Sequence, residues 1–381
     1  MKHFLIILFS IISLGGHAQF WIQKSSFGGV GRHRAVGCAT ENKGYLGLGH
    51  VNGTGVDISY KDWWEYDPAS DSWSQKANFP VNNHGATSFV VNDQPCVGGG
   101  SALAGEFFTF NPDLNTWTPI APCPFFNPGD TQGFSVNNKG YVYLGTQLAE
   151  YDPLTNSWES KAPAPMSFGS WTCSFTIEGS GYVKAGNKLF EYKPMHNTWT
   201  QRANFPGLSS GGSSGFSILQ RGFVTCGYVG GLSTVTDQVW SYYPGTNTWQ
   251  MELEFPGISR RFPVAFAIHD RGYFGTGTNG INLNDFWQFN PTLNIIGMTE
   301  LESFEIKAYP NPCVTKLNIQ FEGELEPHSM GELHDLNGVL VMRFPLSSGL
   351  NEIDVQSIPR GIYILSARHN GTMRKLKINL I

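Results

Sequence analysis

The stretch Trp64-Glu-Tyr66-Asp-Pro68, followed by Trp73, carries the pattern that decides the fold. Two alternating residues, mostly aromatic, precede a proline, and a tryptophan follows the proline after four residues. The frame occurs six times, with prolines at Pro68, Pro112, Pro153, Pro194, Pro244 and Pro291. In the third copy Ala149 replaces the first aromatic residue, and in the sixth Ile296 stands where tryptophan is due. A period of roughly 40 to 50 residues is typical of a repeated unit of four short strands.

Each copy of the frame has a simple physical interpretation. Alternating aromatic residues lie on one face of a strand, where they can pack against a neighbouring sheet. The proline cannot donate to the strand ladder, so it ends the strand and begins a turn. A glycine-bounded strand precedes most copies, as in Gly140-Tyr-Val-Tyr-Leu-Gly145, and a further strand precedes that one, as in Val264-Ala-Phe-Ala-Ile268. These segments together predict four strands per unit.

The missing sixth tryptophan has a counterpart at the start of the chain. Trp21-Ile-Gln-Lys resembles Trp199-Thr-Gln-Arg, so we expect this segment to form the outer strand of the sixth unit. Pairing the two ends in this way would remove an open sheet edge. The chain is therefore predicted to be all-β, with a six-bladed β-propeller closed by an N-terminal outer strand. The six structural tryptophans are Trp21, Trp73, Trp117, Trp158, Trp199 and Trp249.

These features resemble kelch repeats over residues of about 20 to 296. The Tyr-Asp-Pro segment, the spaced tryptophan and a double glycine after the second strand all have counterparts, with the double glycine placed at Gly98-Gly99 and Gly230-Gly231. Asp62 and Asp285 stand six residues before their prolines, where kelch repeats often carry aspartate. The resemblance implies a propeller with a kelch-type channel.

The composition is typical of a protein built from short strands, and it argues against a nucleic-acid partner. Of 381 residues, 45 are glycine, 14% are aromatic and only 14% are charged, with a formal net charge of −5. No Lys/Arg block is present, so a nucleic-acid partner is not expected. The six cysteines are far apart in sequence and form no C-x-x-C motif, so we expect them to be mainly buried and unpaired.

The first 18 residues have the pattern of a signal peptide. Lys2 and His3 precede an apolar run from Phe4 to Leu14, and Gly16-His17-Ala18 offers a small-x-small cleavage site. The run is too short to cross a bilayer, and no transmembrane segment is expected in the mature chain. A buried N-terminal strand is the alternative. We expect residues 1–18 to be removed on export.

After a linker at residues 297–303, residues 304–381 show period-two alternation with turn signals at Asn337-Gly338 and Asn370-Gly371, which predicts a small Ig-like β-sandwich. It resembles the type A sorting domain of the type IX secretion system. The matching residues are Tyr309, Pro310, Asn311, Pro312, Asp335-Leu-Asn-Gly338, Gly361, Tyr363 and the basic end from Arg374 to Leu380. The resemblance implies the type IX machinery as a partner and a secreted or outer-membrane surface location. An ordinary binding sandwich is the alternative.

Candidate ligand-binding residues lie on one face of the predicted propeller, in the loops between blades and after second strands. The longest of these loops are residues 50–61, 228–238 and 278–284, so this face should be built up on one side. The candidates are Arg32, Arg34, His50, His84, Asp130, Trp171, Arg260 and Arg261. They would form a polar, partly aromatic cup for a sugar or peptide, although each of them could instead satisfy buried loop carbonyls.

The sequence contains no recognisable catalytic set, metal-ligand spacing or phosphate-binding loop, so no catalytic residue, metal or cofactor is expected. The predicted function of the propeller domain, residues 19–296, is to bind a glycan or protein at the cell surface. The alternative is a carbohydrate-active enzyme of the mutarotase-like kelch type, which would use arginine and acid/base contacts in the channel.

Overall fold

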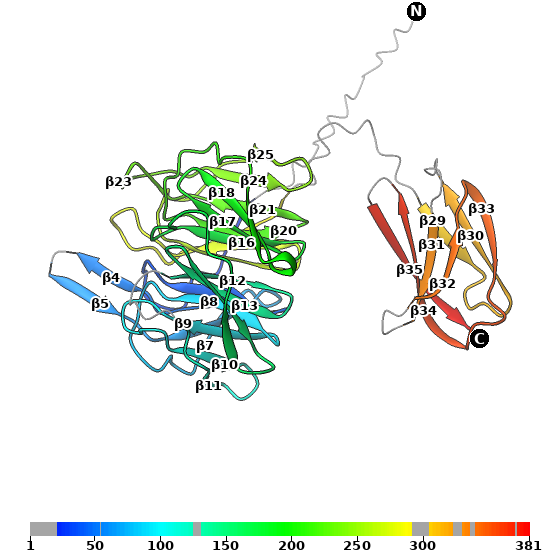
Figure 1. Cartoon of the computed structure of the whole chain (residues 1–381), viewed down its shortest axis with the longest axis horizontal. Coiled ribbons are helices and arrows are strands. Elements are labelled where there is room, and N and C mark those ends of the chain that lie inside the picture. Colours follow the sequence, from blue (N-terminus) through cyan, green and yellow to red (C-terminus); the bar gives the residue numbers. More distant parts are fainter. Residues whose placement is uncertain are drawn as a thin grey trace, which may run out of the picture. The chain divides into compact units, whose positions relative to one another are not determined.

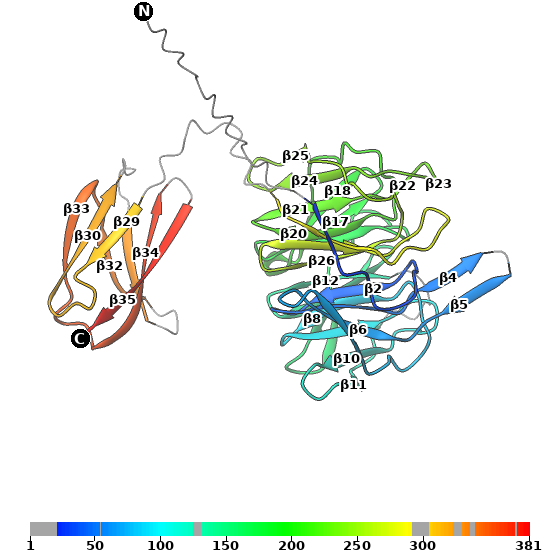
Figure 2. The same cartoon turned by 180° about the vertical axis from the view of Figure 1, so that it is seen from behind.

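The described residues before 292 form six four-stranded antiparallel sheets and two smaller hairpins. The structure is a computed structural model that describes residues 21–53, 55–124, 131–291, 305–322, 330–335, 340–369 and 372–381. The expected signal peptide at 1–18 and the expected linker at 297–303 lie outside these residues. The chain divides into two units, Met1–Thr292 and Leu293–Ile381. Figures 1 and 2 show both units from opposite sides.

The first three sheets follow the chain, and each meanders from its first to its fourth strand. The first contains β2 (Val36–Ala39), β3 (Gly44–Gly47), β6 (Trp63–Asp67) and β7 (Ser72–Lys76). The second contains β8 (Thr87–Val91), β9 (Gln94–Gly98), β10 (Phe107–Asn111) and β11 (Thr116–Pro119). The third contains β12 (Gln132–Val136), β13 (Lys139–Leu144), β14 (Gln147–Asp152) and β15 (Ser157–Ser160).

The remaining three sheets repeat this order, except that the last borrows a strand. The fourth contains β16 (Cys173–Ile177), β17 (Ser180–Ala185), β18 (Lys188–Lys193) and β19 (Thr198–Gln201), with the 3-10 turn η1 (Pro194–His196) before β19. The fifth contains β20 (Ser214–Ile218), β21 (Arg221–Thr225), β24 (Val239–Tyr243) and β25 (Thr248–Met251). The sixth contains β26 (Val264–Ile268), β27 (Arg271–Gly275), β28 (Phe286–Phe289) and β1 (Trp21–Lys24).

The borrowed strand is the N-terminal one. β1 pairs antiparallel with β28, and Trp21 lies opposite Phe289. The Trp21 ring is 4% exposed and packs against Phe255, Phe274 and Phe289. This pairing joins residues from the two ends of the first unit in one sheet.

The first strands of the six sheets contact one another in chain order. β2 lies beside β8, β8 beside β12, β12 beside β16, β16 beside β20, and β20 beside β26, which also lies beside β2. Aromatic and aliphatic side chains fill the space between successive sheets. The first unit is therefore all-β and propeller-like.

A repeated pair of hydrogen bonds ties five of the six outer strands to the sheet before each of them. The indole Nε1 of five repeat tryptophans donates to a backbone carbonyl of the preceding sheet over 2.7 to 3.0 Å: Trp73 to Ser25, Trp117 to Ala77, Trp158 to Ala121, Trp199 to Ala162 and Trp249 to Ala203. The backbone N–H of each acceptor residue donates in turn to a side chain two positions before that tryptophan: Asp71, Asn115, Asn156, Asn197 or Asn247. These five residues are left-handed, a conformation that Asn and Asp tolerate better than most residues.

The glycines after the second strands are placed differently from the sequence expectation. The two successive left-handed residues there are Leu48-Gly49, Gly99-Gly100, Cys226-Gly227 and Thr276-Gly277. The double glycine of the second sheet is thus one residue later than Gly98-Gly99. The pair Gly230-Gly231 was expected directly after the second strand of its repeat. It lies instead at the turn between β22 (Tyr228–Val229) and β23 (Gly231–Val235).

The described residues of the second unit form two sheets. One contains β29 (Glu305–Tyr309), β30 (Lys316–Glu322) and β33 (Gly349–Asp354). The other contains β31 (Met330–His334), β32 (Leu340–Pro345), β34 (Gly361–His369) and β35 (Thr372–Leu380). Asn311, from the predicted motif, donates to the Lys377 carbonyl and accepts from the Asn379 N–H, so the motif fastens the last strand. The Tyr363 hydroxyl donates to the Pro359 carbonyl. Tyr309, Pro310 and Pro312 are exposed, and Gly361 begins β34.

Candidate ligand-binding site

A cavity of about 440 Å³ lies among the first strands of the six sheets. Its walls are residues 34–39, 85–90, 132–135, 171–176, 212–217 and 262–267, so every sheet of the first unit contributes. None of these residues is Asp, Glu, Lys or His. The cavity thus runs along the inner edges of the sheets, and among the described residues its wall is neutral apart from Arg34 at one end.

Hydroxyl groups on this wall connect neighbouring sheets. Ser88 Oγ donates to the Gly37 carbonyl over 3.0 Å, Ser174 Oγ to the Gly133 carbonyl over 2.8 Å, and Thr176 Oγ1 to the Ser135 carbonyl over 2.9 Å. A hydroxyl that donates its proton still carries lone pairs that can accept another hydrogen bond. The wall therefore offers neutral acceptors to a ligand.

Two hairpins project beside one end of the cavity. They are β4 (His50–Gly53) with β5 (Val56–Ser59), and β22 with β23, and they lie within the stretches predicted as the long loops after second strands. Figures 1 and 2 both show them extending from the same side of the first unit. The loop at 278–284 folds back through bridges of Thr278 to Arg261 and Asn282.

Three histidines from three segments meet at the base of the β4–β5 hairpin. His33 Nε2 and His50 Nε2 are 2.8 Å apart, and the His50 and His84 ring centroids are 3.9 Å apart. His33 Nδ1 lies 2.7 Å from Asn282 Oδ1, an arrangement in which the ring nitrogen donates to the amide oxygen. His33 Nε2 then accepts a hydrogen bond from the ring Nε2–H of His50. Ser59, on β5, is hydrogen-bonded to His84 Nδ1 at 2.9 Å. The histidines thus hold the hairpin to the body of the first unit.

The surroundings of these rings favour the neutral form. Burial, together with the nearby His33, His84 and Arg34, lowers the pKa of His50 to about 3. Burial also lowers the pKa of His33, against the opposing effect of its hydrogen bond to Asn282, and Arg261, Arg34 and His84 add to the lowering. A proton added to this cluster would be buried among other positive groups.

We expect acid to weaken this contact. An unfolded histidine takes up a proton near pH 6.5, whereas folded His33 and His50 resist it, so their contribution to stability is complete above pH 6.5 and is lost as the pH falls towards their folded pKa values. The free energy of unfolding should fall by up to about 1.4 kcal/mol per pH unit for each such histidine. Urea denaturation at pH 7, 6 and 5 measures this, and His50→Gln should flatten the dependence. His196→Gln, at an exposed position on η1, is the control. Equal pH dependence in all three proteins would contradict the prediction.

Three aromatic side chains, those of Trp171, Tyr228 and Phe262, lie close together near the same end of the cavity. The Trp171 ring centroid is 5.3 Å from that of Phe262 and 6.0 Å from that of Tyr228. Phe262 in turn stacks against His33 at 6.0 Å. Arg261 lies over Phe262 and donates to the Leu232 carbonyl of β23, so it connects this hairpin to the aromatic group. Burial lowers the pKa of Arg261.

Two of the predicted ligand contacts point inward. Arg32 and Arg260 are fully buried, and they form ion pairs with Asp62 and Asp285. Each also donates to a backbone carbonyl, of Leu48 and Thr276 respectively. Burial alone would raise the pKa of Asp285, but Arg260 and the Trp287 indole hold it below its ordinary value. Both arginines satisfy groups of the fold in this structure.

The other predicted residues are distributed as follows. Arg34 and Trp171 line the end of the cavity and are partly exposed. His50 and His84 belong to the histidine cluster, and Arg261 belongs to the aromatic group. Asp130 lies outside the described residues. Sequence reasoning did not single out Tyr228 or Phe262. Phe262 could have been found by aligning the residue two positions before each first strand.

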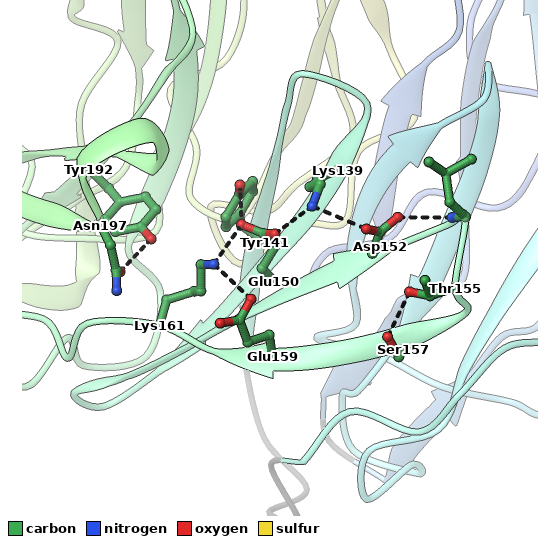
Figure 3. Close-up of polar contacts among 11 residues, drawn as sticks. Lys139, Tyr141, Glu150, Asp152, Thr155, Ser157, Glu159, Lys161, Tyr192 and Asn197 are labelled. Carbon is green, nitrogen blue, oxygen red and sulfur yellow. Dashed lines mark hydrogen bonds and ion pairs between the residues drawn. The ribbon is translucent and has the colours of Figure 1, made fainter.

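Buried carboxylates elsewhere belong to pairs within sheets. In the third sheet Glu150 accepts from Lys139 at 2.8 Å and from Tyr141 at 2.6 Å, and Lys161 lies 3.3 Å away (Figure 3). Burial alone would raise the pKa of Glu150, but these contacts keep it below its ordinary value. Glu191 has the same arrangement with Tyr182 and Arg202. Such carboxylates remain ionised and stabilise the sheets.

The described residues contain neither a group of metal ligands nor a membrane-spanning helix. Among the described residues, no group of three or more His, Cys, Asp or Glu side chains is placed to hold a metal ion. Over the same residues no helix has the length and apolar character needed to span a membrane.

The second unit matches a protein-family model. Residues 307–379 match the model described as a secretion system C-terminal sorting domain. This confirms the sorting domain predicted from the sequence and indicates export of the chain, to the outside or to the cell surface, through the corresponding secretion machinery.

The first unit is similar to a solved propeller structure. The structure of YjhT aligns with a TM-score of 0.60 and 15% sequence identity, covering 71% of this chain and 98% of that one. At this identity the likeness concerns the fold alone and supports a propeller-like arrangement. A search of curated proteins found no match.

Proposed function

We propose that this chain is an exported binding protein: a six-bladed kelch-type propeller, residues 19–296, that holds a glycan or protein ligand at one end of its channel. The signal peptide at 1–18 and the sorting domain at 304–381 direct it to the cell surface. The observation that carries the proposal is the cavity bounded by all six first strands, with hairpins and rings gathered at one end.

Three features support a closed ring of six blades. The described residues before 292 form six four-stranded sheets. The first strands contact one another in a cycle that returns from β26 to β2. The N-terminal strand β1 completes the sixth sheet by pairing with β28.

The character of the cavity favours binding over catalysis. A mutarotase-like enzyme needs an acid or base beside the bound sugar. The described residues that line the cavity include no carboxylate, lysine or histidine, and Asp130 lies outside the described residues. The buried carboxylates Glu150 and Glu191 are paired with cations inside their own sheets. The described part of the site can therefore recognise a ligand through stacking and hydrogen bonds.

Binding and turnover can be separated with the mature full-length protein. We expect binding on an array of defined glycans or to a displayed peptide library, without mutarotation of the bound sugars. Turnover that Arg261→Ala abolishes would overturn the binding assignment in favour of the enzyme.

Export depends on the second unit in this proposal. We expect a chain that lacks residues 304–381 to fold but to remain in the periplasm, because the machinery recognises the sorting domain. Cell fractionation with immunoblotting measures the location, and circular dichroism of the truncated chain checks its fold. The full-length protein is the control. Normal secretion of the folded truncated chain would contradict the role of the second unit.

A further inference from the structure

The residue two positions before each first strand has a left-handed backbone in five of the six sheets. These residues are Arg34 (φ 52°), Gly85 (φ 65°), Trp171 (φ 65°), Gly212 (φ 63°) and Phe262 (φ 55°). The sixth equivalent position, Asp130, lies outside the described residues. All five line the cavity. The fold thus requires a left-handed residue at this point of the repeat.

Glycine meets this requirement without steric cost, as at Gly85 and Gly212. A residue with a Cβ atom loses roughly 1 to 2 kcal/mol in the same conformation. Leu48, Cys226 and Thr276 also have left-handed backbones, but their side chains are buried in the core, where packing offsets the cost. Trp171 and Phe262 are only partly buried. Left-handed residues with bulky side chains often occur at ligand-binding sites.

The two strained aromatic residues lie together although they come from different sheets. With Tyr228 they form one group, in which ring centroids are 5.3 to 6.3 Å apart. Phe262 is also stacked against His33, which is fixed by its hydrogen bonds to Asn282 and His50. The rings are therefore held in place before any ligand arrives, which reduces the entropy lost on binding.

We propose that Trp171, Tyr228 and Phe262 form a stacking platform for a sugar ring at the end of a glycan chain, which enters the cavity between the six first strands. This inference rests on the proposed binding function and specifies its ligand. A pyranose has an apolar face of C–H groups that packs on an aromatic ring, and its hydroxyls project from the edge.

The cavity fits this occupant better than it fits a protein surface. Its volume of about 440 Å³ is in the range of small-ligand sites, which are usually 300 to 1,000 Å³. Its wall carries serine and threonine hydroxyls that can exchange hydrogen bonds with sugar hydroxyls, among them Ser88, Ser174 and Thr176. A folded partner is too large to enter a cavity of this volume. An extended peptide could insert a single side chain, and it is the alternative that the experiment separates.

The strained backbone gives an unusually clean test. Trp171→Gly should keep or raise the melting temperature, because glycine relieves the left-handed strain, while it removes the ring. We expect the mature full-length protein to bind at least one oligosaccharide on an array of defined neutral and uronate-containing glycans. Trp171→Gly and Phe262→Gly should each weaken this binding at least tenfold by isothermal titration calorimetry with that oligosaccharide. Trp171→Phe should stay within about threefold of the original protein.

The control is Ile258→Ala, an exposed position in the same loop as Phe262 that does not line the cavity. This variant should bind the oligosaccharide as tightly as the original protein does. Oligosaccharide binding that survives Trp171→Gly would overturn the platform. Binding to a displayed peptide library without any binding to the glycan array would overturn the sugar ligand but leave the proposed binding function intact. An absence of binding to both libraries would overturn the two together.

Discussion

Replacing Trp21 with alanine should lower the free energy of unfolding of the first unit by about 3 to 5 kcal/mol, the usual loss for truncating a buried tryptophan. The ring is 4% exposed and contacts Phe255, Phe274 and Phe289. It also anchors β1, which supplies the outer strand of the sixth sheet. Loss of this anchor would expose the edge of β28 as well as leaving a cavity. Urea denaturation followed by tryptophan fluorescence measures the change.

The same strand offers a matched control. Ile22 is the next residue of β1 and is 37% exposed. Ile22→Ala keeps the strand and its pairing, so we expect a loss below about 1 kcal/mol. Equal stability of Trp21→Ala and Ile22→Ala would show that β1 is a dispensable terminal strand and would contradict closure of the ring through the N-terminus.

Breaking the Arg260–Asp285 pair should have an effect of similar size. The Arg260 side chain is fully buried and that of Asp285 is 22% exposed. Arg260→Ala leaves a largely buried carboxylate without its cationic partner, and it removes a donor to the Thr276 carbonyl, so we expect a loss of about 3 kcal/mol. The double variant Arg260→Met/Asp285→Leu should recover part of it, because no unpaired charge remains. Chemical denaturation of the three proteins measures the differences.

An exposed pair in the same sheet serves as the control. Arg271 and Asp270 form an ion pair with side chains that are 41% and 55% exposed. Arg271→Ala should change stability by no more than about 0.5 kcal/mol. If Arg260→Ala instead left the stability unchanged and removed ligand binding, Arg260 would be a ligand contact, as the sequence reasoning expected, and the structural role assigned to it here would be wrong.

The sequence predicted the features that depend on local patterns. Alternation of aromatic residues, prolines at strand ends and glycines at turns repeat in phase, so the strands and their grouping by fours could be read directly. The sorting domain was predicted from short motifs such as Tyr309-Pro-Asn-Pro312, and Asn311 now has a physical role in fastening β35. The pair Gly230-Gly231 was assigned to the repeat wrongly, because it sits in the β22–β23 hairpin, which lies outside the repeat.

The candidate site was predicted only in part, and the reason is geometric. The loop residues assigned to one face from the sequence include Arg34, His50, His84 and Trp171, and in the structure these lie beside the cavity or its hairpin. The direction of each side chain could not be read from the sequence. Arg32 and Arg34 are two residues apart, yet Arg32 is buried against Asp62 and Arg34 lines the cavity.

The sequence by itself thus determined the repeated strand pattern, the all-β class and the sorting domain, because each of these follows from residues close together in the chain. Only the tertiary structure decided which side chains share the end of the cavity. His33 and Asn282 are 249 residues apart, and Trp171 meets Phe262 from another sheet. Contacts of this kind depend on how the sheets are arranged around the cavity, and no local pattern in the chain encodes that arrangement.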